Sequence, residues 1–305
     1  MNILVVGGTG LIGSHITKNL LENGHSVTIA TRGARADAFG GRVGRVVFDR
    51  QNPQQIAAAL AGKVYDVVYD TQAYSSNEVK YLLDAAKCSR YIEVSTVSVY
   101  APNFKLGQPE GDFDPLKHPL KWCNRTDFDY GEIKRQAECA MYQAYGHIPS
   151  VAVRLPFVVG TDDDTRRLHF YVKNILARKP MFIDNMDARL SFILSCEAGR
   201  FIAWLADRDI CGPVNAGSRG EVSLAEIIAY VEGKTGIKAV LCDDGEKGAY
   251  NGCPSYGMDL SRVGTVAPTE ACHSGLDPES GFSFSRTCDW MPALLDQLIQ
   301  SERNV

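Results

Sequence analysis

The sequence predicts an α/β protein, with a doubly wound parallel sheet followed by a smaller C-terminal α/β lobe. Three observations lead to this prediction. Short apolar runs rich in β-branched residues alternate with helical stretches through the first half of the chain. A glycine-rich turn joins the first of these runs to the first helical stretch. After residue 160 the alternation stops, and mostly helical segments follow.

The expected strands are apolar almost throughout, which is typical of a parallel sheet with helices on both faces. They are residues 2–6, 26–30, 45–48, 66–70, 90–95 and 150–155. The helices expected between them are residues 11–24, 53–62 and 77–87. The first helix places Ile12, Ile16 and Leu20 on one face and ends at Gly24.

The second region has a different pattern. Residues 161–179 are expected to form a loop that leads into a helix, and residues 195–207 a further helix. Residues 222–236 begin with a serine followed three positions later by a glutamate, which predicts a capping box at the start of another helix. Residues 243–285 are rich in Gly, Ser, Pro and Asp, so we expect long loops there.

Composition narrows the class of protein. The chain of 305 residues has a formal net charge of -4 and a pI near 5.9. These values give no long-range attraction to nucleic acid or to an anionic membrane, so we expect a small-molecule partner. The chain has neither an apolar stretch long enough to span a bilayer nor a secretory signal, which predicts a cytoplasmic protein. Nine cysteines without a CxxC pair indicate reduced thiols and no metal site.

The glycine-rich turn is GGTGLIGSH, residues 7–15. Its position between a strand and an amphipathic helix turns unpaired N–H groups and the positive end of the helix dipole toward any ligand in the turn. Gly7 permits a tight turn, Gly10 permits close approach of a pyrophosphate, and Gly13 permits close packing of helix on strand. Leu11 and Ile12, which begin the helix, are further candidates for cofactor contact. The alternative is a structural turn without a ligand.

The residue after the second strand indicates which dinucleotide is bound. An acidic residue there would bind the ribose hydroxyls of NAD, but the chain has Thr31 followed by Arg32, with Arg35 close by. A guanidinium favours a 2'-phosphate, so we expect NADP to be preferred over NAD. Asp49, after the third strand, is a candidate to accept a hydrogen bond from the adenine amino group. Solvated surface charges are the alternative interpretation of these residues.

Tyr130 and Lys134 are spaced i, i+4 in a probable helix, so they share one face. A nearby ammonium favours the phenolate of a tyrosine, which can then give or take a proton at a substrate hydroxyl. Tyr230 and Lys234 have the same spacing. The first pair is favoured because it follows a strand that ends in Thr96, and ligands of open α/β sheets bind beyond such strand ends.

These residues resemble the extended short-chain dehydrogenase/reductases, a group of NAD(P)-dependent epimerases and dehydratases. The resemblance rests on motifs in the family's order: GGTGLIGSH at 7–15, STVSVY at 95–100, YGEIK at 130–134, RLPFVVG at 154–160 and GPVNAG at 212–217. It implies that Thr96, Tyr130 and Lys134 are catalytic, with Tyr130 as the acid/base. Thr96 would then bind the reacting oxygen, and Lys134 would bind the nicotinamide ribose.

The resemblance also implies an organisation. Residues 1–160 would form the NAD(P)-binding Rossmann domain, to which residues 190–217 return. Residues 161–189 and 218–305 would form the substrate-binding lobe, and the protein would be a homodimer. Arg125, Arg166 and Arg189 are candidates to bind an anionic group of the substrate, although surface loops and local neutralisation explain them almost as well.

Two departures bear on the reaction. In sugar-nucleotide 4,6-dehydratases Asp and Glu follow the hydroxyl residue, whereas Val97 and Ser98 follow it here, which disfavours dehydration. Sugar-nucleotide epimerases usually have an Asn in the turn that is Pro156 to Gly160 here, and its absence argues against a nucleotide-sugar substrate. The resemblance as a whole nevertheless implies hydride transfer at a carbinol or keto carbon of a sugar nucleotide or related small molecule. The alternatives are an NADPH-dependent ketoreductase and a non-catalytic nucleotide-sensing or RNA-associated scaffold, against which the acidic pI argues.

Overall fold

The computed structural model describes residues 1–248 and 281–304, and all structural statements below concern those residues. The chain forms two compact units. Unit 1 comprises residues 1–102, 110–156 and 196–216. Unit 2 comprises residues 103–109, 157–195 and 217–305. Each unit is described by itself.

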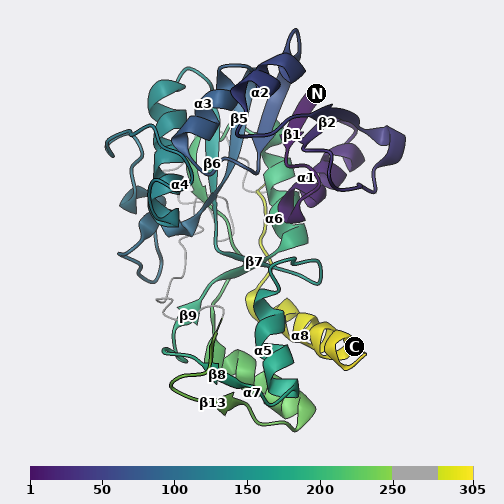
Figure 1. Ribbon diagram of the computed structural model, residues 1–305, viewed down its shortest axis with the longest axis vertical. Coiled ribbons are helices and arrows are strands. Elements are labelled where there is room, and N and C mark those ends of the chain that lie inside the picture. The colour runs from purple at the N-terminus through teal and green to yellow at the C-terminus, as the bar shows by residue number, and fades with distance from the viewer. Residues whose placement is uncertain (249–280, 305) are drawn as a thin grey trace. The chain divides into compact units, whose positions relative to one another are not determined.

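Unit 1 is built on a seven-stranded sheet whose strands are all parallel (Figure 1). Its order is β11-β6-β5-β4-β1-β2-β3. The strands are β1 (Asn2–Val6), β2 (Ser26–Thr31), β3 (Gly44–Val47), β4 (Val64–Asp70), β5 (Lys87–Thr96), β6 (Ser150–Leu155) and β11 (Gly212–Asn215). The doubly wound parallel sheet expected from the sequence is confirmed. The direction of strand order reverses between β1 and β4, and ligands of such sheets bind at that point.

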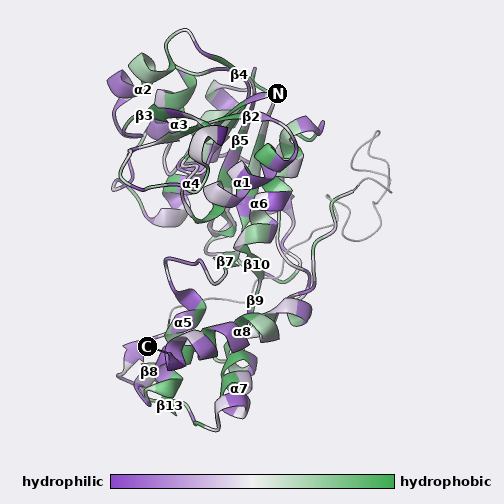
Figure 2. Cartoon of the chain, turned by 90° about the vertical axis from the view of Figure 1, so that its right-hand side faces the viewer, coloured by the Kyte–Doolittle hydropathy of each residue, from purple (hydrophilic) through white to green (hydrophobic). Residues whose placement is uncertain are grey.

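Helices cover both faces of this sheet (Figure 1). On one face lie α1 (Leu11–Glu22) and α6 (Ser195–Trp204), where the Tyr69 hydroxyl of β4 donates to the carbonyl of Ala203. On the other face lie α2 (Pro53–Leu60), α3 (Ser76–Leu83) and α4 (Tyr130–Cys139). The central strands between them are buried and largely hydrophobic (Figure 2), because helices shield both faces of the sheet from water.

Local sequence explains where the helices on the second face begin. The Asn52 side chain accepts from the Gln55 N–H, and Pro53 occupies the first position of α2. The Asp129 carboxylate accepts from the Glu132 N–H, so α4 begins at Tyr130. The helix continues into a π turn, Ala140–Ala144. The short 3-10 turns are Gly40–Arg42, Val97–Tyr100, Glu110–Asp112 and Leu205–Asp207.

Unit 2 packs three helices around a second core: α5 (Arg167–Leu176), α7 (Leu224–Thr235) and α8 (Thr287–Arg303). The predicted capping box of α7 is confirmed, because Ser223 and Glu226 each bond the other's backbone N–H. Three small sheets complete the described part of the unit. They pair β7 (Phe157–Val159) with β10 (Phe192–Leu194), β9 (Arg189–Leu190) with β12 (Val222–Ser223), and β8 (Pro180–Phe182) with β13 (Val240–Leu241) and β14 (Glu246–Lys247).

One expectation is partly wrong, and part of it is not described. The first residues of the stretch expected to be loops, 243–285, include strand β14, because Glu246 and Lys247 extend the small sheet beside β8. The rest of that stretch up to residue 280 lies outside the described residues. Within the described ranges, no helix combines the length and the apolar character that a membrane crossing requires. The seven cysteines in these ranges are free thiols.

Candidate active site

The glycine turn after β1 is shaped by close backbone packing. Gly7 has φ +80°, and a Cβ on it would lie 2.2 Å from the Thr71 Oγ1 at the end of β4. A Cβ on Gly13 would lie 2.1 Å from the carbonyl oxygen of Gly7, so only glycine lets α1 approach the turn this closely. The Gly10 N–H donates to that same carbonyl at 3.0 Å. The first N–H groups of α1 therefore start directly at the turn, which is the arrangement that holds a phosphate.

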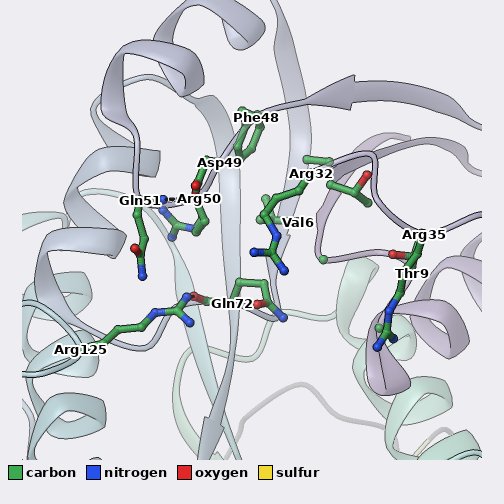
Figure 3. Close-up of a pocket in the computed structure, with 14 residues that line it drawn as sticks. Val6, Thr9, Arg32, Arg35, Phe48, Asp49, Arg50, Gln51, Gln72 and Arg125 are labelled. Atoms are coloured by element: carbon green, nitrogen blue, oxygen red, sulfur yellow. Dashed lines mark hydrogen bonds between the residues drawn. The ribbon is translucent and has the colours of Figure 1, made fainter. Parts of the chain in front are cut away.

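A cavity of about 380 Å³ opens beside this turn, at the carboxyl ends of β1 to β4 (Figure 3). Among the predicted cofactor residues, Gly7, Gly10, Arg32 and Asp49 line it. The predicted residues Leu11, Ile12, Gly13 and Lys134 are not among the lining residues. The full lining is Val6, Gly7, Thr9, Gly10, Ala30, Thr31, Arg32, Arg35, Phe48, Asp49, Arg50, Gln51, Gln72 and Arg125.

The cavity is strongly cationic, with four arginines against the single carboxylate of Asp49. Arg32 makes no hydrogen bond or ion pair within the described part of the chain, and Figure 3 shows its guanidinium directed into the cavity toward Gln72. Arg50 is anchored, because it is ion-paired with buried Asp70 and donates to the carbonyl of Glu78. Burial lowers the pKa of Arg50, but the nearby Asp70 outweighs it and the pKa is raised. The cavity therefore keeps positive charge available for an anionic ligand.

Tyr130 and Lys134 lie on one face of α4, at its N-terminus, and differ in exposure. Tyr130 is 49% exposed and its hydroxyl has no hydrogen-bond partner among the residues that the structure describes. Lys134 is 3% exposed, and its ammonium donates to the Ala73 carbonyl (2.5 Å), the Glu93 carboxylate (2.8 Å) and the Val94 carbonyl (3.0 Å). Burial lowers the pKa of Lys134, but Glu93 and then Tyr130 raise it, and the pKa is raised overall. The lysine is thus a charged group whose three hydrogens already have acceptors.

Three consecutive residues after β4, Gln72 to Tyr74, connect this pair with the cavity. Gln72 lines the cavity, and the next residue, Ala73, accepts the bond from Lys134. The ring of Tyr74 lies 6.4 Å from the ring of Tyr130, centroid to centroid, and 5.9 Å from the Lys134 Nζ. The segment after β4 therefore contacts both the cavity at the glycine turn and the Tyr130–Lys134 pair.

Thr96 ends β5 and caps the turn that follows it. Its Oγ1 accepts from the Ser98 N–H at 3.2 Å and lies 3.2 Å from the Ser98 Oγ. A Cβ on Gly131, the residue after Tyr130, would lie 2.9 Å from the Ser98 carbonyl oxygen. The first turn of α4 is thus packed against the turn that Thr96 caps.

The three arginines considered for substrate all have carboxylate partners. Arg125 donates to Glu78 at 2.6 Å, stacks on the ring of Tyr74 at 4.1 Å, and lines the cavity at the glycine turn. In unit 2, Arg166 is paired with Glu302 at 3.0 Å. Arg189 is paired with Glu226 at 2.6 Å and donates to the carbonyl of Glu221. Any anionic ligand of these arginines would have to compete with those carboxylates.

Sequence reasoning missed Arg50, Gln72, Tyr74 and Glu93. The signal for Glu93 was present, because a carboxylate between apolar residues of a strand with both faces covered must have a charged partner. Gln72 and Tyr74 follow directly after a central strand, in the region where ligands of open sheets bind. Arg50 follows Asp49 and gave no signal, because its partner Asp70 is distant in the sequence.

The parallel doubly wound sheet with a glycine turn at its first crossover defines the dinucleotide-binding class of α/β proteins. The chain belongs to the NAD dependent epimerase/dehydratase family, whose family model matches residues 3–217. The resemblance seen in the sequence is thereby confirmed.

Individual relatives are more distant. The chain is 31% identical over 124 residues to the chloroplast stem-loop binding protein of 41 kDa b of Arabidopsis thaliana, covering 36% of this chain and 33% of that protein. It is 25% identical over 260 residues to UDP-glucuronic acid decarboxylase 1 of the same plant, covering 76% of this chain and 58% of the relative. The chain therefore matches 33% of the length of the first relative and 58% of the length of the second, which is less than two thirds of either.

Among solved structures, the fold is similar to that of UDP-glucuronic acid 4-epimerase from Bacillus cereus, crystallised with UDP-glucuronic acid and NAD. The TM-score is 0.69 at 23% identity, and the match covers 99% of this chain and 100% of that one. At this level of identity the likeness establishes the fold.

Proposed function

We propose that the protein is an NAD(P)-dependent enzyme that transfers hydride at a carbinol or keto carbon of a sugar nucleotide or a related small molecule. One observation carries the proposal: Tyr130 is half exposed, its hydroxyl has no hydrogen-bond partner among the described residues, and its helix neighbour Lys134 is a buried, charged lysine. A tyrosine in this setting can act as acid/base at a substrate oxygen. Family membership and relatives that act on UDP-glucuronic acid support this substrate class.

The residues present fit a dinucleotide. The cradle at Gly7 and Gly10 admits no side chain at Gly7, and its helix N-terminus suits a pyrophosphate. When bound, the nicotinamide would supply or accept the hydride. Tyr130 would hold or release the proton of the reacting oxygen, and Thr96 would position that oxygen by exchanging its bond with Ser98. Lys134 would bind a ribose hydroxyl only in exchange for one of its three present bonds, so its charge is its main contribution.

NADP is the proposed preference. Arg32 supplies a guanidinium without a partner in residues 1–248 and 281–304, directed into the cavity, and Arg35 also lines it. A 2'-phosphate is the group that this charge would bind. Asp49 remains the candidate for the adenine amino group, since its side chain lines the same cavity.

The wider organisation is also a proposal. Unit 1 would bind the cofactor and unit 2 would bind the substrate, with Arg166 and Arg189 as candidates for its anionic group. A homodimer and a cytoplasmic location stay predictions of the sequence. Light scattering of the purified protein tests the first of these.

The arginines of the cavity favour an enzyme that catalyses a net reduction, because they would bind the 2'-phosphate of NADPH and NADPH commonly serves reduction. A scaffold that binds RNA is the candidate from another class. It is favoured by the similarity to the stem-loop binding protein and by the four arginines around the cavity. The net charge of -4 argues against it.

The experiment that separates these candidates compares the wild type with Tyr130→Phe. Both proteins are incubated with NADPH or NADP and a panel of nucleotide sugars and keto compounds, and product and absorbance at 340 nm are followed. The enzyme proposal predicts turnover only in the wild type, with equal NADPH affinity in both proteins. Absence of turnover in the wild type, together with salt-dependent binding of a stem-loop RNA, would favour the scaffold.

A further inference from the structure

Glu93 is an ionisable group in the interior of the sheet that the proposed reaction does not use. It lies in β5 and is completely buried. Its Oε1 accepts from the Lys134 Nζ at 2.8 Å, while its Oε2 has no hydrogen-bond partner in the described part of the chain. A buried carboxylate with an unsatisfied oxygen costs stability, so its presence calls for an explanation at this place.

The contacts of Lys134 supply that explanation. Its ammonium has three hydrogens and meets three acceptors, of which two are backbone carbonyls and one is the Glu93 carboxylate. Two neutral carbonyls alone would not compensate a buried ammonium, because burial favours the uncharged amine. Glu93 is therefore the group that keeps the lysine protonated in this interior.

We propose that Glu93 is a positioning residue of the Tyr130–Lys134 pair: its carboxylate fixes the Lys134 ammonium between the Ala73 and Val94 carbonyls and keeps it charged beside Tyr130. The inference rests on the proposed function. In this role Glu93 contacts neither substrate nor cofactor. The positive charge of Lys134 beside Tyr130 instead depends on Glu93, which lies in the sheet behind α4.

The neighbouring buried carboxylates, Asp70 and Glu138, are each paired with an arginine and not with Lys134. Asp70 is its cross-strand neighbour on β4, but Asp70 is ion-paired with Arg50 and accepts from the Tyr91 hydroxyl. Glu138 is on α4, but it is paired with Arg154 of β6 at 2.6 Å. Each buried carboxylate of this cluster thus has its own cation, and the cation of Glu93 is Lys134.

This arrangement has a consequence near neutral pH. Burial raises the pKa of Glu93, the charge of Lys134 lowers it, and the repulsion from Glu138 raises it again, to about 7. With Glu93 ionised, the pair with Lys134 is neutral as a whole. With Glu93 protonated, the ammonium has lost its counterion, so the charged form of Lys134 beside Tyr130 is less strongly favoured.

The direct test follows Lys134 itself by NMR of lysine side chains labelled with ¹³C at Cε, in the wild type and in Glu93→Gln. The inference predicts that the titration midpoint of Lys134 falls by at least about two pH units in the variant, because a buried ammonium has lost its counterion. The matched control is Asp296→Asn, which removes the carboxylate 2.9 Å from exposed Lys234. There the shift should be a small fraction of a unit. A Lys134 midpoint that does not move in Glu93→Gln overturns the inference, whatever the activity of the protein.

Kinetics provide the second readout. For Glu93→Gln we expect an unchanged Kd for NADPH, a kcat lower by about tenfold and a pH profile displaced from that of the wild type. An equal kcat and an equal pH profile would contradict the positioning role. Activity retained in Tyr130→Phe would instead contradict the proposed function, so the two failures are distinguishable.

If Glu93→Gln does not fold, the double substitution Glu93→Gln with Lys134→Met still tests the pairing. Removing both charges leaves no unpaired buried ion, so the double variant should be more stable than either single variant. A double variant whose loss of stability equals the sum of the two single losses would show that the residues do not act as a pair, and would overturn the inference.

Discussion

The chain contains the Tyr-x-x-x-Lys spacing twice, and the structure gives the two copies different surroundings. Tyr130 and Lys134 begin α4 in unit 1, where the lysine is buried against the sheet and the tyrosine hydroxyl is unbonded within the described residues. Tyr230 and Lys234 lie on α7 in unit 2. Both donate to the same carboxylate, that of Asp296 on α8, each at 2.9 Å.

The difference shows that spacing defines a face of a helix, whereas the surface behind that face defines the chemistry. In α7 the carboxylate of Asp296 lies at the surface and accepts a hydrogen bond from both side chains, so the hydroxyl and the ammonium are tied to the same group. In α4 the carboxylate, Glu93, comes from the interior and engages only the lysine. The tyrosine is left exposed with a cation beside it, which is the arrangement that acid/base catalysis needs.

The largest expected effect is the loss of turnover when the Tyr130 hydroxyl is removed, compared with removal of the Tyr230 hydroxyl. Tyr130→Phe should reduce kcat by about 10³-fold, because the proton at the reacting oxygen loses its donor and acceptor. Tyr230→Phe should leave kcat within about twofold, because it removes only a bond to Asp296. Steady-state kinetics on the best substrate of the panel measure both. Equal losses in the two variants would contradict the assignment of different roles.

Replacing the lysine of each Tyr-x-x-x-Lys copy should change the free energy of unfolding by different amounts. Lys134→Met leaves Glu93 buried without a cation and should lower the free energy of unfolding by about 3 kcal/mol. Lys234→Met removes an exposed partner of Asp296, and we expect no measurable change. Urea denaturation at pH 8 followed by circular dichroism compares them. A Lys134→Met protein as stable as the wild type would mean that the buried pair is not formed in solution.

The arginines extend the comparison from the tyrosines to the two units. Arg32 in unit 1 has no partner in the described ranges, whereas Arg189 in unit 2 is paired with Glu226. Arg32→Ala should weaken NADPH binding by about tenfold and NADH binding little, because only NADPH has the 2'-phosphate. Arg189→Ala should change neither. Isothermal titration measures the four affinities, and an equal loss for NADPH and NADH in Arg32→Ala would contradict the preference for NADP.

The smallest expected effect concerns the third residue of each helix, Glu132 in α4 and Glu226 in α7. Burial raises the pKa of Glu132, but hydrogen bonds from Gln136, His118 and Arg135 outweigh it and bring the pKa to about 2. Because the pKa of Glu132 is lowered in the folded protein, its ionised carboxylate stabilises the fold at pH values above the ordinary carboxyl pKa near 4.5. This stabilisation is lost as the pH falls toward 2.

Glu132→Gln should therefore cost about 1 kcal/mol at pH 7, after allowance for solvent screening, and nearly nothing at pH 2. Thermal unfolding at several pH values measures the difference. Glu226→Gln should show the same direction, because the backbone bond from Ser223 lowers the pKa of Glu226. A destabilisation by Glu132→Gln that does not decrease on acidification would argue against the network around α4.

Much of this fold could be predicted from the sequence, because apolar strands, glycine punctuation and capping residues are local signals. The glycine turn, the six expected strands of unit 1 and the capping box of α7 are of this kind. The environment of Lys134 could not be predicted in the same way, since Ala73, Glu93 and Lys134 are far apart in the chain and meet only when β4, β5 and α4 pack. The anchoring of Arg50 by Asp70 is hidden for the same reason.

We propose that Tyr130 faces a dinucleotide held at the glycine turn, and a crystal structure of the protein with NADPH would show whether it does. In that structure we expect the pyrophosphate over Gly7 and Gly10, the 2'-phosphate against Arg32, and the Tyr130 hydroxyl within about 4 Å of the nicotinamide C4 or of a substrate oxygen next to it. A dinucleotide bound outside this cavity, or a nicotinamide directed away from Tyr130, would contradict it.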